Sequence, residues 1–220
     1  MKKHLVLIEL NEINFDVVRS YIEHGVSLPA FGQLLAGPSV DTFAEDSYEL
    51  LEPWIQWPSV HLGCDFSKHK IFRLGDIIRC SQAQIFEQVE ALGYSVGVLG
   101  AMNADNRLVK PAYFIPDPWT STSSDGDILN EMLTSALIQS VNDNSGGRLA
   151  FSSVFSLAIN FVVRVPIWKW PSMISYAAGC LKKPWKKSIF LDRFLHEIHM
   201  SLFRRCRPNF STVFFNAGAH

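Results

Sequence analysis

Three short runs of apolar and β-branched residues predict the strands of this chain. Leu5 to Leu10 is almost wholly apolar, as expected of a strand buried in a parallel sheet. Tyr94 to Leu99 is a second such run, and Thr212 to Phe215 is a third. Apolar residues at helical spacing lie between them, so the pattern predicts an α/β fold: a predominantly parallel sheet flanked by helices, with the three strands as neighbours.

The predicted helices have apolar residues three and four positions apart and turn residues at their ends. Phe15, Val18 and Ile22 share one face of a helix that Gly25 ends. Further helices are predicted from Pro29 to Gly37, after a capping box at Ser81–Gln84, around Leu129–Val141 and around Leu191–Leu202, with connections at 111–118 and at Gly146-Gly147.

Residues 149–187 differ from the rest in composition. Leu149 to Val163 carries no charge, and three tryptophans interleaved with five lysines follow it. An uncharged stretch of this length is shorter than the roughly 20 residues that span a bilayer. Two interpretations stay open: a helical cap over the sheet, or an interfacial surface whose tryptophans lie at headgroup depth while lysines attract anionic lipid or an anionic polymer.

This contrast sets the predicted domain organisation. Residues 1–148 are predicted as the N-terminal part of an α/β domain, 149–203 as a helical, basic, Trp-rich cap or insertion, and 204–220 as a returning strand. Residues 1–140 contain nine Lys and Arg against eighteen Asp and Glu, whereas residues 141–220 contain eleven against three. The two parts are therefore expected to face different partners, while Arg204, Arg205 and Arg207 are predicted as solvated surface charges.

The whole-chain values exclude several classes of protein. A formal net charge of −1 with a pI near 6.6 does not indicate nucleic-acid binding. Four cysteines without metal-ligand spacing are expected to be reduced thiols. The apolar run after the basic start is too short for a signal sequence, so we expect a cytoplasmic protein, peripheral to the inner face of the membrane if residues 149–187 contact lipid.

Seven stretches, in this order along the chain, resemble the alkaline phosphatase superfamily, and most closely its type I phosphodiesterase/nucleotide pyrophosphatase branch. They are Leu5-Val-Leu-Ile-Glu-Leu-Asn-Glu12, residues 28–37, Pro53-Trp-Ile-Gln-Trp-Pro-Ser-Val-His-Leu-Gly63, Ser67-Lys-His-Lys-Ile71, residues 85–100, Phe114-Ile-Pro-Asp-Pro-Trp119 and Phe214-Phe-Asn-Ala-Gly-Ala-His220. The resemblance implies an alkaline-phosphatase-like sheet. Because the last stretch stops within a motif, we expect the chain to be the N-terminal part of a longer protein.

The resemblance also implies a divalent metal site, with zinc as the expected ion. Asn11 and Glu12 follow the first strand, and Asn216 and His220 follow the last, at the positions of metal-binding residues. Asn11 and Asn216 stand where aspartates are expected, and an amide is a weaker, uncharged ligand for a dication. We expect Asn11 and His220 to approach each other where the strands end.

The stretch 53–63 resembles the nucleophile segment. An ungapped comparison places Pro53, which has no hydroxyl group, at the nucleophile, so Ser59 takes that role only if the loop is re-registered. Glu52, Gln56 and His61 are the other candidate catalytic residues. We expect the two tryptophans of this stretch to anchor it in the core, which places those three residues at the rim or floor of the same crevice.

These observations predict a phosphoesterase-like hydrolase. Its substrate would be a phosphodiester or pyrophosphate of a nucleotide, a nucleotide sugar or a lipid-linked glycan, with no nucleic-acid partner. The alternative is a catalytically inactive pseudoenzyme or binding module of the same fold, peripheral to the membrane in surface-polysaccharide assembly. The residues Asn11, Pro53 and Asn216 favour that alternative.

Overall fold

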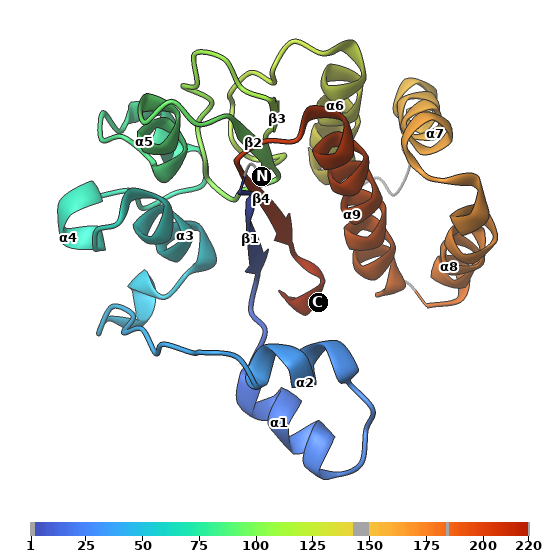
Figure 1. Cartoon of the computed structure of the whole chain (residues 1–220), viewed down its shortest axis with the longest axis horizontal. Helices are drawn as coiled ribbons and strands as arrows, with labels where there is room; N and C mark the ends of the chain where they lie inside the picture. The colour runs from blue at the N-terminus through green and yellow to red at the C-terminus, as the bar shows by residue number, and fades with distance from the viewer. Residues whose placement is uncertain (1–2, 143–149, 184, 220) are drawn as a thin grey trace.

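The computed structural model describes residues 3–142, 150–183 and 185–219, and within them a four-stranded parallel sheet forms the centre (Figure 1). The strands are β1 (Leu5–Leu10), β2 (Val96–Leu99), β3 (Tyr113–Ile115) and β4 (Phe210–Phe215), in the spatial order β1-β4-β2-β3. The predicted α/β class and parallel sheet are confirmed. The strand β3 lies in the stretch that was predicted as a connection.

The last strand of the described chain occupies the middle of the sheet. β4 pairs with β1 from Leu5 opposite Phe210 to Leu10 opposite Phe215, and with β2 on its other side. The carboxyl ends of β1 and β4 are therefore level. The ladder continues one step further, because the Asn11 N–H donates to the Phe215 carbonyl oxygen at 3.0 Å.

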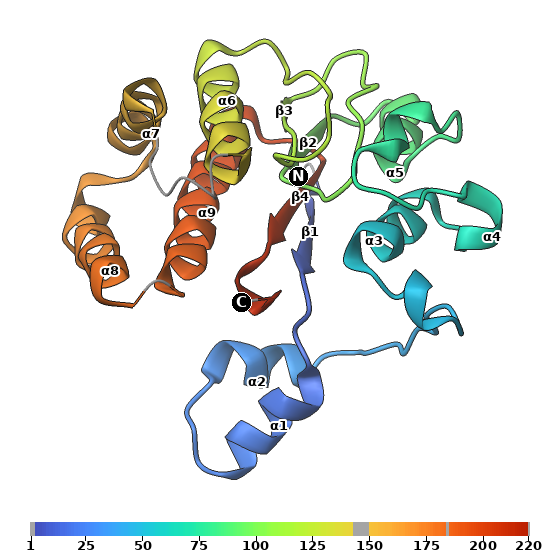
Figure 2. The same ribbon diagram turned by 180° about the vertical axis from the view of Figure 1, so that it is seen from behind.

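Helices cover both faces of this sheet (Figures 1 and 2). One face carries α3 and α5, and the other carries α6 and α9. The helices α7 and α8 lie outside that second layer. The helices α1 and α2 project beyond the carboxyl end of β1. Their bounds are α1 Phe15–Glu23, α2 Pro29–Leu35, α3 Pro53–Leu62, α4 Phe66–His69, α5 Ile85–Ala91, α6 Ile128–Asn142, α7 Phe151–Arg164, α8 Trp170–Lys182 and α9 Lys186–Cys206, with single 3₁₀ turns η1 Tyr48–Leu50, η2 Asp76–Arg79, η3 Ile167–Lys169 and η4 Ala217–Ala219.

The largest hydrophobic cluster joins the sheet to α9. Leu99 and Val213 of the sheet pack in it with Ile198 and Leu202, all of them buried. A smaller cluster on the other face joins Phe86 of α5 to β2, β3 and β4. Because α9 covers the sheet directly, the predicted boundary between residues 203 and 204 falls inside a helix of the main layer.

Two local predictions differ from the structure. β1 was predicted as a buried strand, but Leu5 is 63% and Ile8 55% exposed, because β1 lies at the edge of the described sheet with β4 as its one partner. The capping box lies three residues later than predicted: the Glu87 carboxylate accepts the Gln84 N–H at 2.7 Å, and α5 begins at Ile85. The predicted break at Gly146-Gly147 lies outside the described residues.

Candidate functional site

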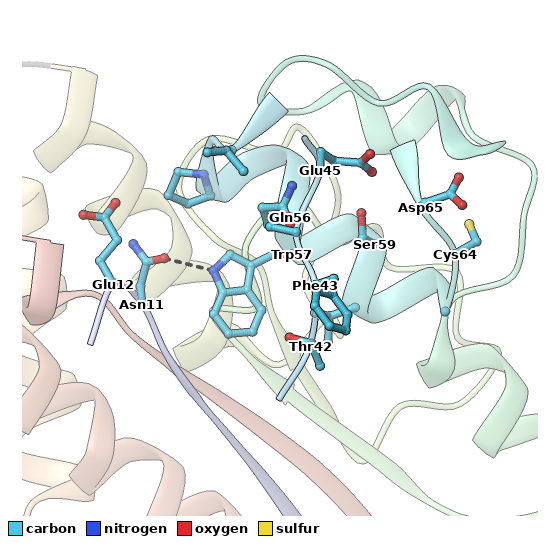
Figure 3. Close-up of a pocket in the computed structure, with 15 residues that line it drawn as sticks. Asn11, Glu12, Thr42, Phe43, Glu45, Gln56, Trp57, Ser59, Cys64 and Asp65 are labelled. Carbon is cyan, nitrogen blue, oxygen red and sulfur yellow. Dashed lines mark hydrogen bonds between the residues drawn. The ribbon is translucent and has the colours of Figure 1, made fainter. Parts of the chain in front are cut away.

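A cleft of about 640 Å³ opens beside the carboxyl end of β1 (Figure 3). Its lining comes from three segments of the chain: the residues after β1, the stretch before α3, and α3 with the turn that follows it. The lining residues are Asn11, Glu12, Thr42, Phe43, Ala44, Glu45, Leu51, Pro53, Gln56, Trp57, Ser59, Val60, Gly63, Cys64 and Asp65. Parallel sheets bind ligands at this edge. Four predicted site residues, Asn11, Glu12, Gln56 and Ser59, line this cleft, which we call the strand-end cleft.

Asn11 and Asn216 lie together where the first and last strands end. The Asn11 Nδ2 donates to the Asn216 Oδ1 at 2.8 Å, and the Asn11 Oδ1 accepts from the Trp57 Nε1 at 3.0 Å. The approach is close, since a Cβ on Gly218 would overlap the Asn11 carbonyl oxygen. His220, the fourth predicted metal residue, lies outside the described residues.

This amide pair does not fit the metal centre that the resemblance implies. Both side-chain oxygens, on Asn11 and on Asn216, already accept hydrogen bonds, and neither group carries a charge to offset a dication. Glu12 follows in a left-handed backbone conformation with its side chain exposed. Within the described part of the chain, no three His, Cys, Asp or Glu side chains gather closely enough to hold a metal ion.

The segment after Glu52 is a helix, and that explains where its polar residues point. Pro53 starts α3 and Gly63 ends it with a left-handed backbone. One helical face, with Gln56 and Trp57, lines the cleft, while the opposite face is buried against the core. The Trp57 ring packs edge-on against Phe214 at 5.5 Å between ring centroids, so this tryptophan anchors the helix as expected.

His61 lies in the core beneath the cleft instead of in its lining. Its Nε2 is 3.2 Å from the Glu9 Oε1, which also accepts from the Thr212 Oγ1 at 2.6 Å. The ring lies between Trp57 and Phe86. The expectation that His61 lies at the rim or floor is wrong, because position 61 faces the sheet on the buried side of α3.

Glu52 also lies outside the lining. It occupies the N-cap position of α3 with an exposed side chain that makes no capping hydrogen bond. Of the three residues expected at the rim or floor, Gln56 alone lines the cleft, and its Nε2 donates to the Leu50 carbonyl oxygen at 2.6 Å.

Ser59 has a histidine partner that was not among the predicted site residues. The Ser59 Oγ lies 2.9 Å from the His69 Nε2, and the His69 Nδ1 accepts the Ile71 N–H at 3.0 Å. Burial lowers the pKa of His69, so the ring is neutral at pH 7. Its proton then resides on Nε2, which donates to Ser59, and Ser59 donates to the Ile55 carbonyl oxygen at 3.3 Å. In this tautomer His69 cannot accept the Ser59 proton.

The strand-end cleft is acidic. Glu12, Glu45 and Asp65 line it, whereas the described lining residues include no Lys or Arg. A hydrogen bond from Ser67 lowers the pKa of Asp65, which stays ionised. Glu45 accepts the Phe66 N–H at 2.7 Å. The resemblance of the stretch Ser67–Ile71 indicated that the segment containing His69 belongs to the site. No pattern in the sequence around Glu45 indicated that this residue would line the cleft.

Comparison of the chain with protein-family models, with curated proteins and with solved structures finds no match.

Proposed function

We propose that the chain is a phosphoesterase-like domain of the alkaline phosphatase superfamily, of the type I phosphodiesterase/nucleotide pyrophosphatase branch. Its substrate is a phosphodiester or pyrophosphate of a nucleotide, nucleotide sugar or lipid-linked glycan, and it binds in the strand-end cleft. One observation carries the proposal. Asn11 and Asn216 meet beside Trp57, and the resemblance assigns their three segments to a single site.

Ser59 is the candidate nucleophile of this hydrolase. The Ser59 hydroxyl group belongs to a residue of the cleft lining. Neutral His69 donates a hydrogen bond to the Ser59 oxygen and cannot accept its proton, so another group has to accept that proton during the reaction. The three carboxylates of the cleft also repel an anionic phosphoester. We therefore expect the cleft residues alone to bind a phosphoester weakly, and the test includes Zn²⁺ because it is the ion that the resemblance implies.

The second candidate is a binding module of the same fold that does not hydrolyse its ligand. The closed amide pair of Asn11 and Asn216 and the donor role of His69 favour it, because neither arrangement activates a nucleophile. In this form the domain acts at the inner face of the membrane in surface-polysaccharide assembly.

Hydrolysis of bis(4-nitrophenyl) phosphate by the whole chain tests the proposal. The assay is run with added Zn²⁺ and with a chelator, for the parent, for Ser59→Ala and for Ser20→Ala, which replaces an exposed serine of α1 as a matched control. Binding of a non-hydrolysable phosphonate analogue is measured alongside by calorimetry.

Zinc-dependent turnover that Ser59→Ala abolishes and Ser20→Ala retains supports the hydrolase. Zinc-dependent binding of the phosphonate without turnover supports the binding module. If the parent neither hydrolyses the ester nor binds the phosphonate with zinc present, the strand-end cleft is not a phosphoester site.

A further inference from the structure

The helix α7 exposes much of its apolar surface, although Leu157 and Phe161 on its inner side pack against the core. Its exposed side chains form an apolar stripe at helical spacing: Phe151, Val154, Phe155, Ala158 and Val162. Its most buried positions are polar: Ser153, Asn160 and Arg164. An exposed apolar stripe of this kind indicates a surface that contacts a membrane or another protein.

The polar side of α7 packs against α6. The Asn160 Nδ2 donates to the Leu129 carbonyl oxygen at 3.2 Å, and the Arg164 Nη2 donates to the Asn130 Oδ1 at 2.5 Å. Ser153 bonds to Gln139. The hydrogen bonds of its polar residues thus point toward α6, whereas its apolar stripe is exposed. The helix itself lies outside the layer that covers the sheet (Figure 1).

The apolar surface continues past the end of α7. Val163 in the last turn of α7 is exposed, and so are Ile167 and Trp168 beyond it, Trp168 at 75%. Within the described residues, no single helix is long and apolar enough to cross a bilayer, whereas Phe151–Arg164 and Ile167–Cys180 together pass the same test as a pair bent by 116°. A bent pair with this composition is suited to lie in a bilayer interface.

A basic cleft of about 460 Å³ adjoins this surface, between the end of α7 and the C-terminal half of α9. It is lined by Val163, Arg164, Val165, Pro166, Trp168, Glu197, Ser201, Arg204 and Arg205, and it shares no residue with the strand-end cleft. We call it the arginine cleft. Arg204 and Arg205, predicted as merely solvated, here meet an arginine forty positions earlier in the chain.

Arg164 is the buried member of the arginine cleft. Its residue is 5% exposed, and its Nη1 has no hydrogen-bond partner among the described residues. Burial lowers the pKa of Arg164, although a guanidinium stays charged at neutral pH. A buried donor without an acceptor is costly, and a phosphate oxygen that reached Arg164 from the cleft would supply one.

The charges around the cleft favour an anion. Lys169 pairs with Glu197 at 2.6 Å, which neutralises the carboxylate of the lining. Asp127 lies 3.4 Å from both Arg164 and Arg205 and is shared between them. The cleft lining itself thus has three arginines and one carboxylate, while Asp127 and Asp125 outside the lining offset part of the charge of Arg164.

We propose that the arginine cleft binds the phosphate of an anionic phospholipid headgroup while the apolar stripe of α7 enters the bilayer interface. The two features lie side by side, since Val163 and Trp168 belong to both the exposed apolar surface and the cleft lining. A site for a free phosphate has no need of the apolar stripe. This site stands whether or not the strand-end cleft hydrolyses a phosphoester, because the two clefts have separate linings.

Co-sedimentation of the whole chain with vesicles tests the proposal. The vesicles are phosphatidylcholine alone, or phosphatidylcholine mixed with phosphatidylglycerol. The variants are Arg204→Gln with Arg205→Gln, and Phe155→Ser with Val162→Ser. The matched control is Lys68→Gln with Arg79→Gln, two exposed cations outside both clefts. All these positions are exposed, and far-UV circular dichroism checks that each variant folds.

The parent is expected to bind the anionic vesicles and to bind the neutral ones weakly. Removing both arginines should weaken anionic binding about thirtyfold, since each basic residue near such a surface contributes about 1 kcal/mol. The apolar variant should weaken it about tenfold. The control variant should bind as the parent does.

Three results overturn the proposal. Unchanged binding of the double arginine variant removes the cleft from the contact. An equal loss in the control shows attraction by overall charge alone. Unchanged binding of the Phe155 and Val162 variant, together with displacement of vesicles by inorganic phosphate, shows that the cleft is a site for free phosphate.

Discussion

A single buried residue, Asn103, compensates for the proline inside α3. Pro58 has no N–H to donate to the Trp54 carbonyl oxygen one turn earlier. The Asn103 Nδ2 fills this gap at 2.8 Å and also donates to the Arg73 carbonyl oxygen at 3.1 Å, while its Oδ1 accepts the Gly75 N–H at 2.9 Å. The residue thereby joins α3, which lines the strand-end cleft, to the segment before η2.

We predict that Asn103→Gly destabilises the protein by roughly 3 kcal/mol, because it leaves buried backbone groups unpaired. Glycine tolerates the left-handed backbone at this position, so backbone strain is not the cause. The cost should be smaller in a Pro58→Ala background, where residue 58 regains an N–H for Trp54. Urea unfolding of the two single variants and the double variant measures this coupling. Strict additivity would contradict the assigned role of Asn103.

The buried residue His199 makes the stability of the protein depend on pH. His199 is buried on α9, with its Nε2 unpaired among the described residues, and burial lowers its pKa to about 4. In the unfolded chain the group titrates near its ordinary value of 6.5. Below that pH His199 binds a proton in the unfolded state but not in the folded state. The free energy of unfolding therefore falls as the pH drops from about 6.5 to about 4.

We predict that His199→Phe reduces this acid sensitivity. The parent should lose about 3 kcal/mol more than the variant between pH 6.5 and pH 4, given about 1.4 kcal/mol for each pKa unit. Unfolding midpoints in urea across this range measure the difference. Equal pH slopes in the parent and the variant would assign the acid sensitivity to other groups.

At the scale of elements, the local pattern of apolar residues predicted most of the strands and helices. Continuous apolar runs predicted β1, β2 and β4, and helical spacing of apolar residues predicted helices that the structure shows as α1, α2, α5, α6 and α9. The local pattern missed α3, whose two prolines obscure the helical spacing, and therefore misplaced His61. It also missed β3, which is three residues long and lies between prolines.

Periodicity cannot say which side of a helix faces outward, and α7 shows why this matters. The stripe of Phe151 and Phe155 has the spacing of a core face, but the hydrogen bonds of Asn160 and Arg164 turn the polar side inward. The sequence did not predict the arginine cleft either, because residues 164 and 204 are far apart in the chain and meet only when α9 packs on the sheet.

We predict that Asn160→Ala destabilises the protein by about 1 kcal/mol, because the Leu129 and Ser156 carbonyl oxygens each lose a hydrogen bond from the Asn160 Nδ2. Val162→Ala on the exposed side of the same helix is the matched control and should change stability by less than about 0.5 kcal/mol. Urea unfolding of both variants makes the comparison. A larger cost for Val162→Ala would mean that α7 packs through its apolar stripe in water.

At the scale of the whole molecule, the fold separates two electrostatic sites. Glu12, Glu45 and Asp65 surround the strand-end cleft, while the arginine cleft lies among the helices on the other side of the sheet. The sequence indicated this division, with a net charge of −9 over residues 1–140 and +8 over 141–220. It did not indicate that arginines, more than the lysines near residue 185, would gather around a cleft.

Because the arginine cleft is proposed to attract anionic lipid by its charge, vesicle binding should depend steeply on the salt concentration. Attraction between the arginine cleft and an anionic bilayer acts over a screening length of about 10 Å at 0.1 M salt and about 3 Å at 1 M. Binding to phosphatidylglycerol vesicles should therefore weaken strongly across that range, and residual binding at high salt should depend on Phe155 and Val162. Neutralising the other site with Glu45→Gln and Asp65→Asn should not weaken binding. Vesicle binding that is insensitive to salt, or lost in that acidic-site variant, would show that the two sites do not act separately.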